Sequence, residues 1–176
     1  MDKSQILKEI IESRKSTFPR DYTGEGLAPE VLNAILDSAQ FVPNHKRTRP
    51  WRFRVFTGAQ KDELGATLAG IYRDTTPPAV FLQKKYEDIP AKAGKAGAII
   101  SISVAFSGLV PEWEEIAAVA MGVQNMYLTC TATNVGCYWS SPGLIKYLDG
   151  YLGLAENEKC YGLFYLGALK SELDEI

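Results

Sequence analysis

Histidine is almost absent from this sequence, since His45 is the only one among 176 residues. Metal sites built from several histidines are therefore excluded, and a Ser-His-Asp or Cys-His catalytic pair would have to use His45. Cysteine is also scarce: Cys130, Cys137 and Cys160 are odd in number and form no C-x-x-C pair. This pattern predicts reduced, mostly buried thiols in a cytoplasmic protein rather than a disulfide framework.

Strong net charge and long apolar runs are missing as well. The 19 basic and 21 acidic residues give a net charge of −2, which does not favour binding of nucleic acid or anionic membrane by the whole surface. The longest apolar stretch, residues 98–106, is too short to span a bilayer, and the charged N-terminal segment has no signal core. We therefore expect no nucleic-acid partner, no membrane partner and no secretion.

Three widespread nucleotide and hydrolase motifs are also missing. The chain has no G-x-G-x-x-G, no P-loop and no G-x-S-x-G. Rossmann, NTPase and α/β-hydrolase interpretations therefore have no motif support.

What is present is typical of an ordinary globular chain, with 46% hydrophobic and 23% charged residues, and its length predicts one domain over 1–176. Strands do not alternate regularly with helices, so the expected fold class is α+β. Segment 74–97, rich in Pro and Gly, is expected to be irregular and mobile, with room for one short helix. Hydrophobic periodicity predicts helices ending near Arg14, over 29–40, around 64–72 and over 112–134, and strands over 51–56, 98–106, 137–139 and 161–166.

Arg14, Lys15 and Ser16 form the first candidate site. Two cations and a hydroxyl in a row suit a phosphate group. The ordinary alternative is a helix C-terminus carrying cations that complement its dipole.

The second candidate is the loop that contains His45 and leads into Trp51. Five of the nine residues from 46 to 54 are Lys or Arg, which suits an anionic ligand, a phosphate or a nucleic acid. A solvated basic loop is the ordinary alternative.

The third candidate is the turn over 136–142, where a Gly and two Ser surround Trp139. Ser141 and Pro142 predict a helix start, whose free N–H groups could bind a polar ligand. Asn134 and Gly136 are expected to end the preceding helix through positive φ. An ordinary strand–turn–helix joint is the alternative.

Taken in this order, these segments resemble the nitroreductase family of flavin mononucleotide (FMN) enzymes. Family members have a first helix ending in Arg-Arg-Ser and a loop of the form Ala-Pro-Ser-x-x-Asn-x-Gln-Pro-Trp; a branch carries Pro-Asp-His-Lys there, with Pro-x-Trp-Glu and Trp-x-Ser farther on. The resemblance spans about residues 5–168. The matching stretches here are 14–16, 42–51, 111–114, 139–141 and 162–167.

The resemblance implies a mainly antiparallel, mixed sheet wrapped by helices around a long central helix. It also implies a homodimer with FMN at the interface. Arg14, Lys15 and Ser16 would hold the FMN phosphate and ribityl chain, and His45 would lie against the flavin. Trp139, Ser140 and Ser141 would contact the flavin from the other side.

Arg47 and Arg49 replace the family's Asn and Gln, and either could stabilise the reduced flavin by its charge. Lys15 replaces the second Arg, and Lys170 is the only cation after the last strand, so weaker FMN binding is expected.

The implied activity is electron transfer from NADH or NADPH through FMN to a small oxidised acceptor, such as a nitro compound or a quinone, in ping-pong order. The flavin would carry the chemistry, so no catalytic side chain and no metal is expected. The alternatives are a flavin- or nucleotide-binding module without turnover, and an anion-binding domain that uses residues 46–54.

Overall fold

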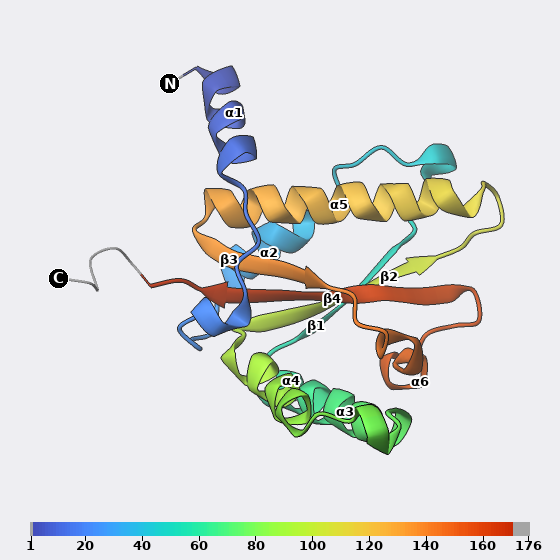
Figure 1. Ribbon diagram of the computed structural model, residues 1–176. Helices are drawn as coiled ribbons and strands as arrows, with labels where there is room; N and C mark the ends of the chain where they lie inside the picture. The colour runs from blue at the N-terminus through green and yellow to red at the C-terminus, as the bar shows by residue number, and fades with distance from the viewer. Residues whose placement is uncertain (1, 171–176) are drawn as a thin grey trace.

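A computed structural model of the chain describes residues 2–170 (Figure 1). The acidic end over 171–176, which the sequence analysis singled out, lies outside the described residues. The described residues form a four-stranded sheet in the order β1-β2-β4-β3, and all three pairings are antiparallel. Its strands are β1 (Trp51–Phe56), β2 (Ala98–Ala105), β3 (Val135–Ser140) and β4 (Glu158–Ala168).

Helices cover both faces of this sheet, which confirms the α+β class (Figure 1). The long α5 and α2 lie on one face, and α3, α4 and α6 lie on the other. The helices are α1 (Lys3–Ser13), α2 (Pro29–Ser38), α3 (Ala59–Thr75), α4 (Gln83–Lys95), α5 (Glu112–Ala132) and α6 (Asp149–Leu152). Short 3-10 helices are η1 (Pro19–Asp21), η2 (His45–Arg47), η3 (Pro78–Val80) and η4 (Ile145–Tyr147).

The core is divided between the two faces by the alternation of β2. Ile100 and Ile102 pack in the cluster that includes Met126 of α5, whereas Ile99 packs in the cluster that includes Leu64 of α3. Every residue of β2 is buried, as its nearly unbroken apolar sequence predicts for a central strand. Two helical layers are therefore needed to cover the sheet.

Helix α1 stands apart from this core and projects from the body of the domain (Figure 1). It begins at an N-cap in which the Asp2 carboxylate accepts from the Ser4 backbone N–H at 3.2 Å. None of its residues is buried, and Ile6, Leu7 and Ile11 are all exposed although they share its apolar stripe. Helix α1 touches only α5 closely among the described helices, so an apolar stripe left this exposed is suited to pack on another molecule.

Two local predictions around the third candidate are wrong. No helix begins at Pro142; residues 142–145 form a turn, closed by the Ile145 N–H donating to the Pro142 carbonyl at 3.0 Å. Gly143, a weak helix former, follows Pro142 directly. Gly136 does not have positive φ, whereas Asn134 does, at 53°. Gly136 instead allows close packing, because a Cβ there would lie 2.7 Å from the Tyr22 ring.

Segment 74–97 is more regular than its Pro and Gly content predicts, since it contains η3 and the 13-residue α4. Its mobility stays a prediction. Gly65 of α3 explains part of the order: a Cβ there would lie 2.6 Å from Ala93 of α4, so the glycine permits the two helices to approach closely.

Candidate functional site

Tyr127 of α5 brings together residues of the first and third candidate sites, which the sequence predicted separately. The Arg14 guanidinium lies 5.3 Å from the centroid of the Tyr127 ring. Ser16 Oγ is 3.3 Å from the Tyr127 hydroxyl, and the Trp139 backbone N–H donates to the same hydroxyl at 2.8 Å. Sequence reasoning missed Tyr127, because one aromatic on a helix rich in small residues gives no sign of this role.

The chain after α1 is held against the edge strand β3, which fixes these neighbours in place. The Thr17 N–H donates to the Cys137 carbonyl at 2.8 Å, and the Tyr22 hydroxyl donates to the Thr17 carbonyl at 2.7 Å. Lys15 is exposed and forms no ion pair within residues 2–170. The cations of residues 14–16 are therefore beside β3 and open to a ligand.

The end of β3 presents the remaining members of the third candidate. Ser140 is half-buried and its Oγ accepts from the Tyr138 hydroxyl at 2.7 Å. Ser141 is exposed where the strand ends. Residues 139–141 therefore continue along the end of β3 from the residue that contacts Tyr127, and their contact with a flavin stays a prediction.

The loop around His45 is held in an unusual backbone conformation. Lys46, Arg47 and Arg49 have φ of 51°, 54° and 46°, in the left-handed region that side chains rarely adopt. Asn44 Oδ1 accepts from the Arg49 N–H at 3.1 Å, and Lys46 Nζ donates to the Leu109 carbonyl at 2.9 Å. Such strain costs about 1–3 kcal/mol per residue and concentrates at functional sites.

This loop meets the opposite end of α5 from Tyr127 (Figure 1). His45 Nδ1 lies 2.6 Å from Glu114 Oε2, in the first turn of α5. Glu114 and Tyr127 are 13 positions apart, or about 20 Å at 1.5 Å rise per residue. One protomer therefore does not bring His45, Arg47 and Arg49 to the Arg14 group.

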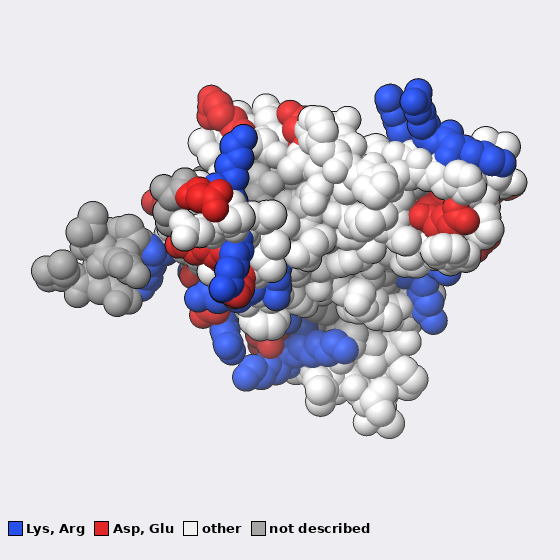
Figure 2. All heavy atoms as spheres, turned by 90° about the horizontal axis from the view of Figure 1, so that it is seen from above, with Lys and Arg blue, Asp and Glu red and all other residues white. Residues whose placement is uncertain are grey.

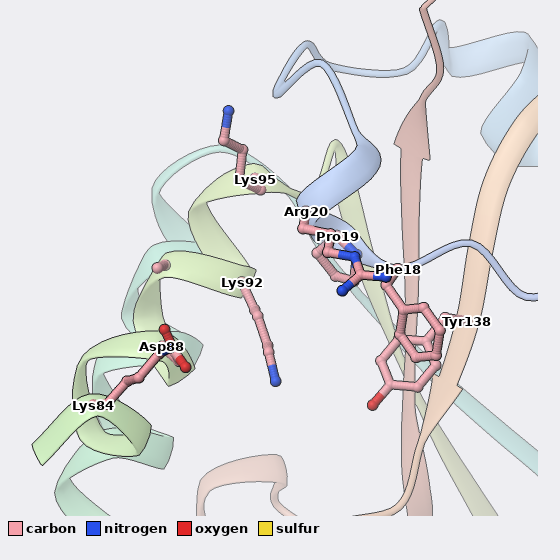
Figure 3. Close-up of a pocket in the computed structure, with 9 residues that line it drawn as sticks. Phe18, Pro19, Arg20, Lys84, Asp88, Lys92, Lys95 and Tyr138 are labelled. Carbon is pink, nitrogen blue, oxygen red and sulfur yellow. The ribbon is translucent and has the colours of Figure 1, made fainter. Parts of the chain in front are cut away.

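A hollow of about 650 Å³ opens beside Phe18 and Tyr138, whose ring centroids are 4.8 Å apart (Figure 3). This volume is within the usual range of small-molecule sites. In Figure 3, Lys92 points from α4 into the space facing the aromatic pair, whereas Lys95 points away. The lining residues are Phe18, Pro19, Arg20, Lys84, Asp88, Ala91, Lys92, Lys95 and Tyr138.

Sequence reasoning missed this basic hollow. Its cations come from η1 and from α4, and the sequence pattern did not define α4. Lys84, Lys92 and Lys95 could have been grouped only by predicting a helix over 83–95. Pro90 lies within that stretch and argues against such a prediction, because proline disfavours the interior of a helix.

Cys130 and Cys160 are poorly suited to act as nucleophiles. A hydrogen bond with Cys137, together with burial, raises the pKa of Cys130 far above its ordinary value. Burial also raises the pKa of Cys160. Both thiols therefore stay neutral near pH 7, where only a thiolate would attack a substrate.

Over the described part of the chain, no three His, Cys, Asp or Glu side chains are grouped to hold a metal ion. No helix within residues 2–170 is both long and apolar enough to cross a membrane.

Comparison with protein families gives a match to the Nitroreductase family over residues 11–168. Among curated proteins, "Putative NAD(P)H nitroreductase YfhC" of Bacillus subtilis is 25% identical over 166 residues, which cover 92% of this chain and 84% of that protein.

Solved structures share the fold. A nitroreductase-like family protein from Bacillus cereus has a TM-score of 0.78 and 21% identity, covering 94% of this chain and 86% of its own. The FMN-dependent nitroreductase NfnB of Mycobacterium smegmatis, in complex with NADPH, has a TM-score of 0.75 and 15% identity, covering 99% and 97%. A nitroreductase with bound FMN from Bacteroides fragilis has a TM-score of 0.70 and 20% identity, covering 97% and 90%.

Proposed function

The chain belongs to the nitroreductase family, and from that premise we propose that it is an FMN-dependent oxidoreductase. It takes electrons from NADH or NADPH and passes them to a small oxidised acceptor, such as a nitro compound or a quinone. The observation that carries this proposal is the meeting of Arg14, Ser16 and Trp139 around Tyr127, in the order that the family pattern implies. The relatives named for FMN and NADPH support the choice of cofactors.

The residues of this chain fit FMN. Arg14 and Lys15 match a phosphate in charge, and the Ser16 hydroxyl adds a hydrogen-bonding group beside them. Ser140 and Ser141 and the backbone around them suit the polar edge of the ring. When bound, FMN supplies the hydride and electron chemistry, and the protein binds and orients it. Donor and acceptor would use the same open face in turn, which gives ping-pong order.

The basic hollow lies across the edge strand β3 from Tyr127, because Tyr138 packs on the face covered by α3 and α4 and Trp139 on the face covered by α5. It begins two residues after Ser16, at Phe18, so a cofactor held at residues 14–16 would reach it by passing the free edge of β3. We assign Lys92, which points into it, to the negatively charged edge of the reduced flavin. A cation at that position favours the reduced over the oxidised cofactor.

A homodimer would complete the site. Helix α1 leaves Leu7 54% exposed, and α5 leaves Trp113 67% exposed. Figure 2 shows that the face seen from above is largely uncharged in its middle, with charged groups gathered toward its two sides. Packing α5 antiparallel against its copy about a two-fold axis would bring the His45 loop of one protomer to the Arg14 group of the other.

We place this activity in the cytoplasm. The three cysteines are free and buried, and unpaired thiols are typical of proteins in reducing compartments.

Absorbance of the purified protein tests the proposal. The protein should carry a flavin spectrum that bleaches with NADPH without oxygen and returns when a quinone is added. A carrier without turnover would stay yellow after NADPH. An anion-binding domain would be colourless, and retention on DNA that falls steeply with salt would point to its basic loop.

A further inference from the structure

The contact between His45 and Glu114 joins two separate elements, η2 and the first turn of α5. His45 Nδ1 and Glu114 Oε2 are 2.6 Å apart. The His45 side chain is 58% exposed and that of Glu114 only 22%. The carboxylate is therefore the enclosed partner, and the ring keeps its other side open.

The backbone on both sides of this contact is held in place by other interactions. Glu114 lies at the N-terminal end of a 21-residue helix, where the dipole favours a negative charge. The next residue, Glu115, is buried and accepts from the Ser107 N–H at 3.1 Å, which anchors the start of α5. On the other side, Lys46 ties the loop to the Leu109 carbonyl. A contact between two anchored groups can set the orientation of the exposed ring.

We infer that Glu114 is the positioning residue for His45, holding the imidazole by Nδ1 so that Nε2 is directed to the cofactor site shared between protomers. The hydrogen bond made by one ring nitrogen determines the protonation of the other. With Nδ1–H donated to Glu114, a neutral His45 keeps Nε2 as an acceptor, and a charged one presents Nε2–H as a donor. The inference rests on the proposed function for the ligand that Nε2 meets.

Because His45 is the only histidine, its ring nitrogens give one unambiguous set of NMR signals in ¹⁵N-labelled protein. The experiment is a long-range ¹H–¹⁵N correlation on the protein without FMN, at a pH where the ring is neutral. Wild type should show the Nδ1–H form. Glu114→Ala should shift the ring toward the Nε2–H form. Glu114→Gln should keep Nδ1–H, because its amide oxygen still accepts the hydrogen bond.

Glu112→Ala is the matched control, since Glu112 lies in the same first turn but is exposed, and within residues 2–170 the hydrogen bond and ion pair of His45 go to Glu114 instead. It removes the same charge and should leave the ring unchanged. An Nδ1–H signal retained in Glu114→Ala, or lost in Glu112→Ala, would overturn the inference. These readouts need no cofactor, so they stand apart from a failure to bind FMN, which would overturn the proposed function instead.

FMN titration supplies the second measurement. Glu114→Ala should weaken FMN binding by about 2- to 10-fold, the effect of one hydrogen bond. In a His45→Ala background the same substitution should have no further effect, because Glu114 acts through His45. An equal loss in both backgrounds would show that Glu114 acts by another route and would refute the positioning role.

Discussion

The Trp139 backbone N–H on β3 donates a 2.8 Å hydrogen bond to the Tyr127 hydroxyl on α5, and Ser16 Oγ lies 3.3 Å from that same hydroxyl. One phenol thus joins the edge strand, the long helix and the segment after α1. This contact makes three distant parts of the sequence into one surface.

Tyr127→Phe should remove the hydrogen bonds that join this surface without leaving a cavity in the core. The ring keeps its edge contact with Phe164, at 4.9 Å between centroids, and its position beneath Arg14. The lost hydroxyl leaves the Trp139 N–H without its acceptor, so the free energy of unfolding should fall by about 1–3 kcal/mol. Urea unfolding of the protein without FMN measures this. An unchanged unfolding midpoint would show that water replaces the phenol at no cost.

Arg14→Ala should weaken FMN binding by about 10- to 150-fold, because charge-assisted hydrogen bonds are worth about 1.5–3 kcal/mol each. Riboflavin lacks the phosphate and should bind the wild type and the variant almost equally. Fluorescence quenching with both ligands measures the difference. Equal FMN affinity in the two proteins would remove Arg14 from the site.

Lys92→Ala should make the midpoint potential of bound FMN more negative, by about 30 mV if the lysine contributes about 1.4 kcal/mol to the reduced form. Lys95→Ala is the control on the same helix, since Lys95 points away from the hollow (Figure 3). Equilibrium titration against a redox dye gives both potentials. Equal shifts in the two variants would mean a general charge effect rather than a contact at the hollow.

Gly162→Ala should destabilise the sheet. A Cβ at Gly162 would overlap the Trp139 indole and lie 2.6 Å from the Ser140 carbonyl oxygen, so the variant is overpacked at the strand that carries the site. The expected loss in unfolding free energy is about 1–3 kcal/mol. Gly150→Ala, where no atom lies within 4 Å of the added Cβ, should change stability little. Chemical denaturation of both variants tests the contrast.

The elements with strong periodicity could be predicted from the sequence. Trp51–Phe56 forms β1 as expected, because large apolar residues and arginines alternate there with period two. The long helix over 112–132 was within two residues of expectation. The start expected at Pro142 failed, because local capping residues could not outweigh the turn that Gly143 and the packing of Ile145 favour.

The candidate site was only partly predictable. Family-like motifs pointed to Arg14, Ser16 and Trp139, which the structure brings together around Tyr127. The roles of Tyr127 and Glu114 depend on contacts over 12 and 69 positions of sequence, which no local pattern reveals. The separation of His45 from Arg14 along α5 likewise follows only from the fold.

That separation predicts that each FMN site combines the Arg14 group of one protomer with the His45 loop of its partner. Two variants divide the site: Arg14→Glu damages one half, and His45→Glu adds a second carboxylate beside Glu114 in the other half. Each homodimer should bind FMN poorly, because both of its sites carry a lesion.

The direct test is the FMN content of heterodimers of these two variants, co-expressed with different tags and purified through both. Two-fold symmetry leaves one site with both halves intact, so each heterodimer should hold about one FMN, against about two for the wild-type dimer. If the heterodimers contain as little FMN as the two variant homodimers, the site is not shared between protomers.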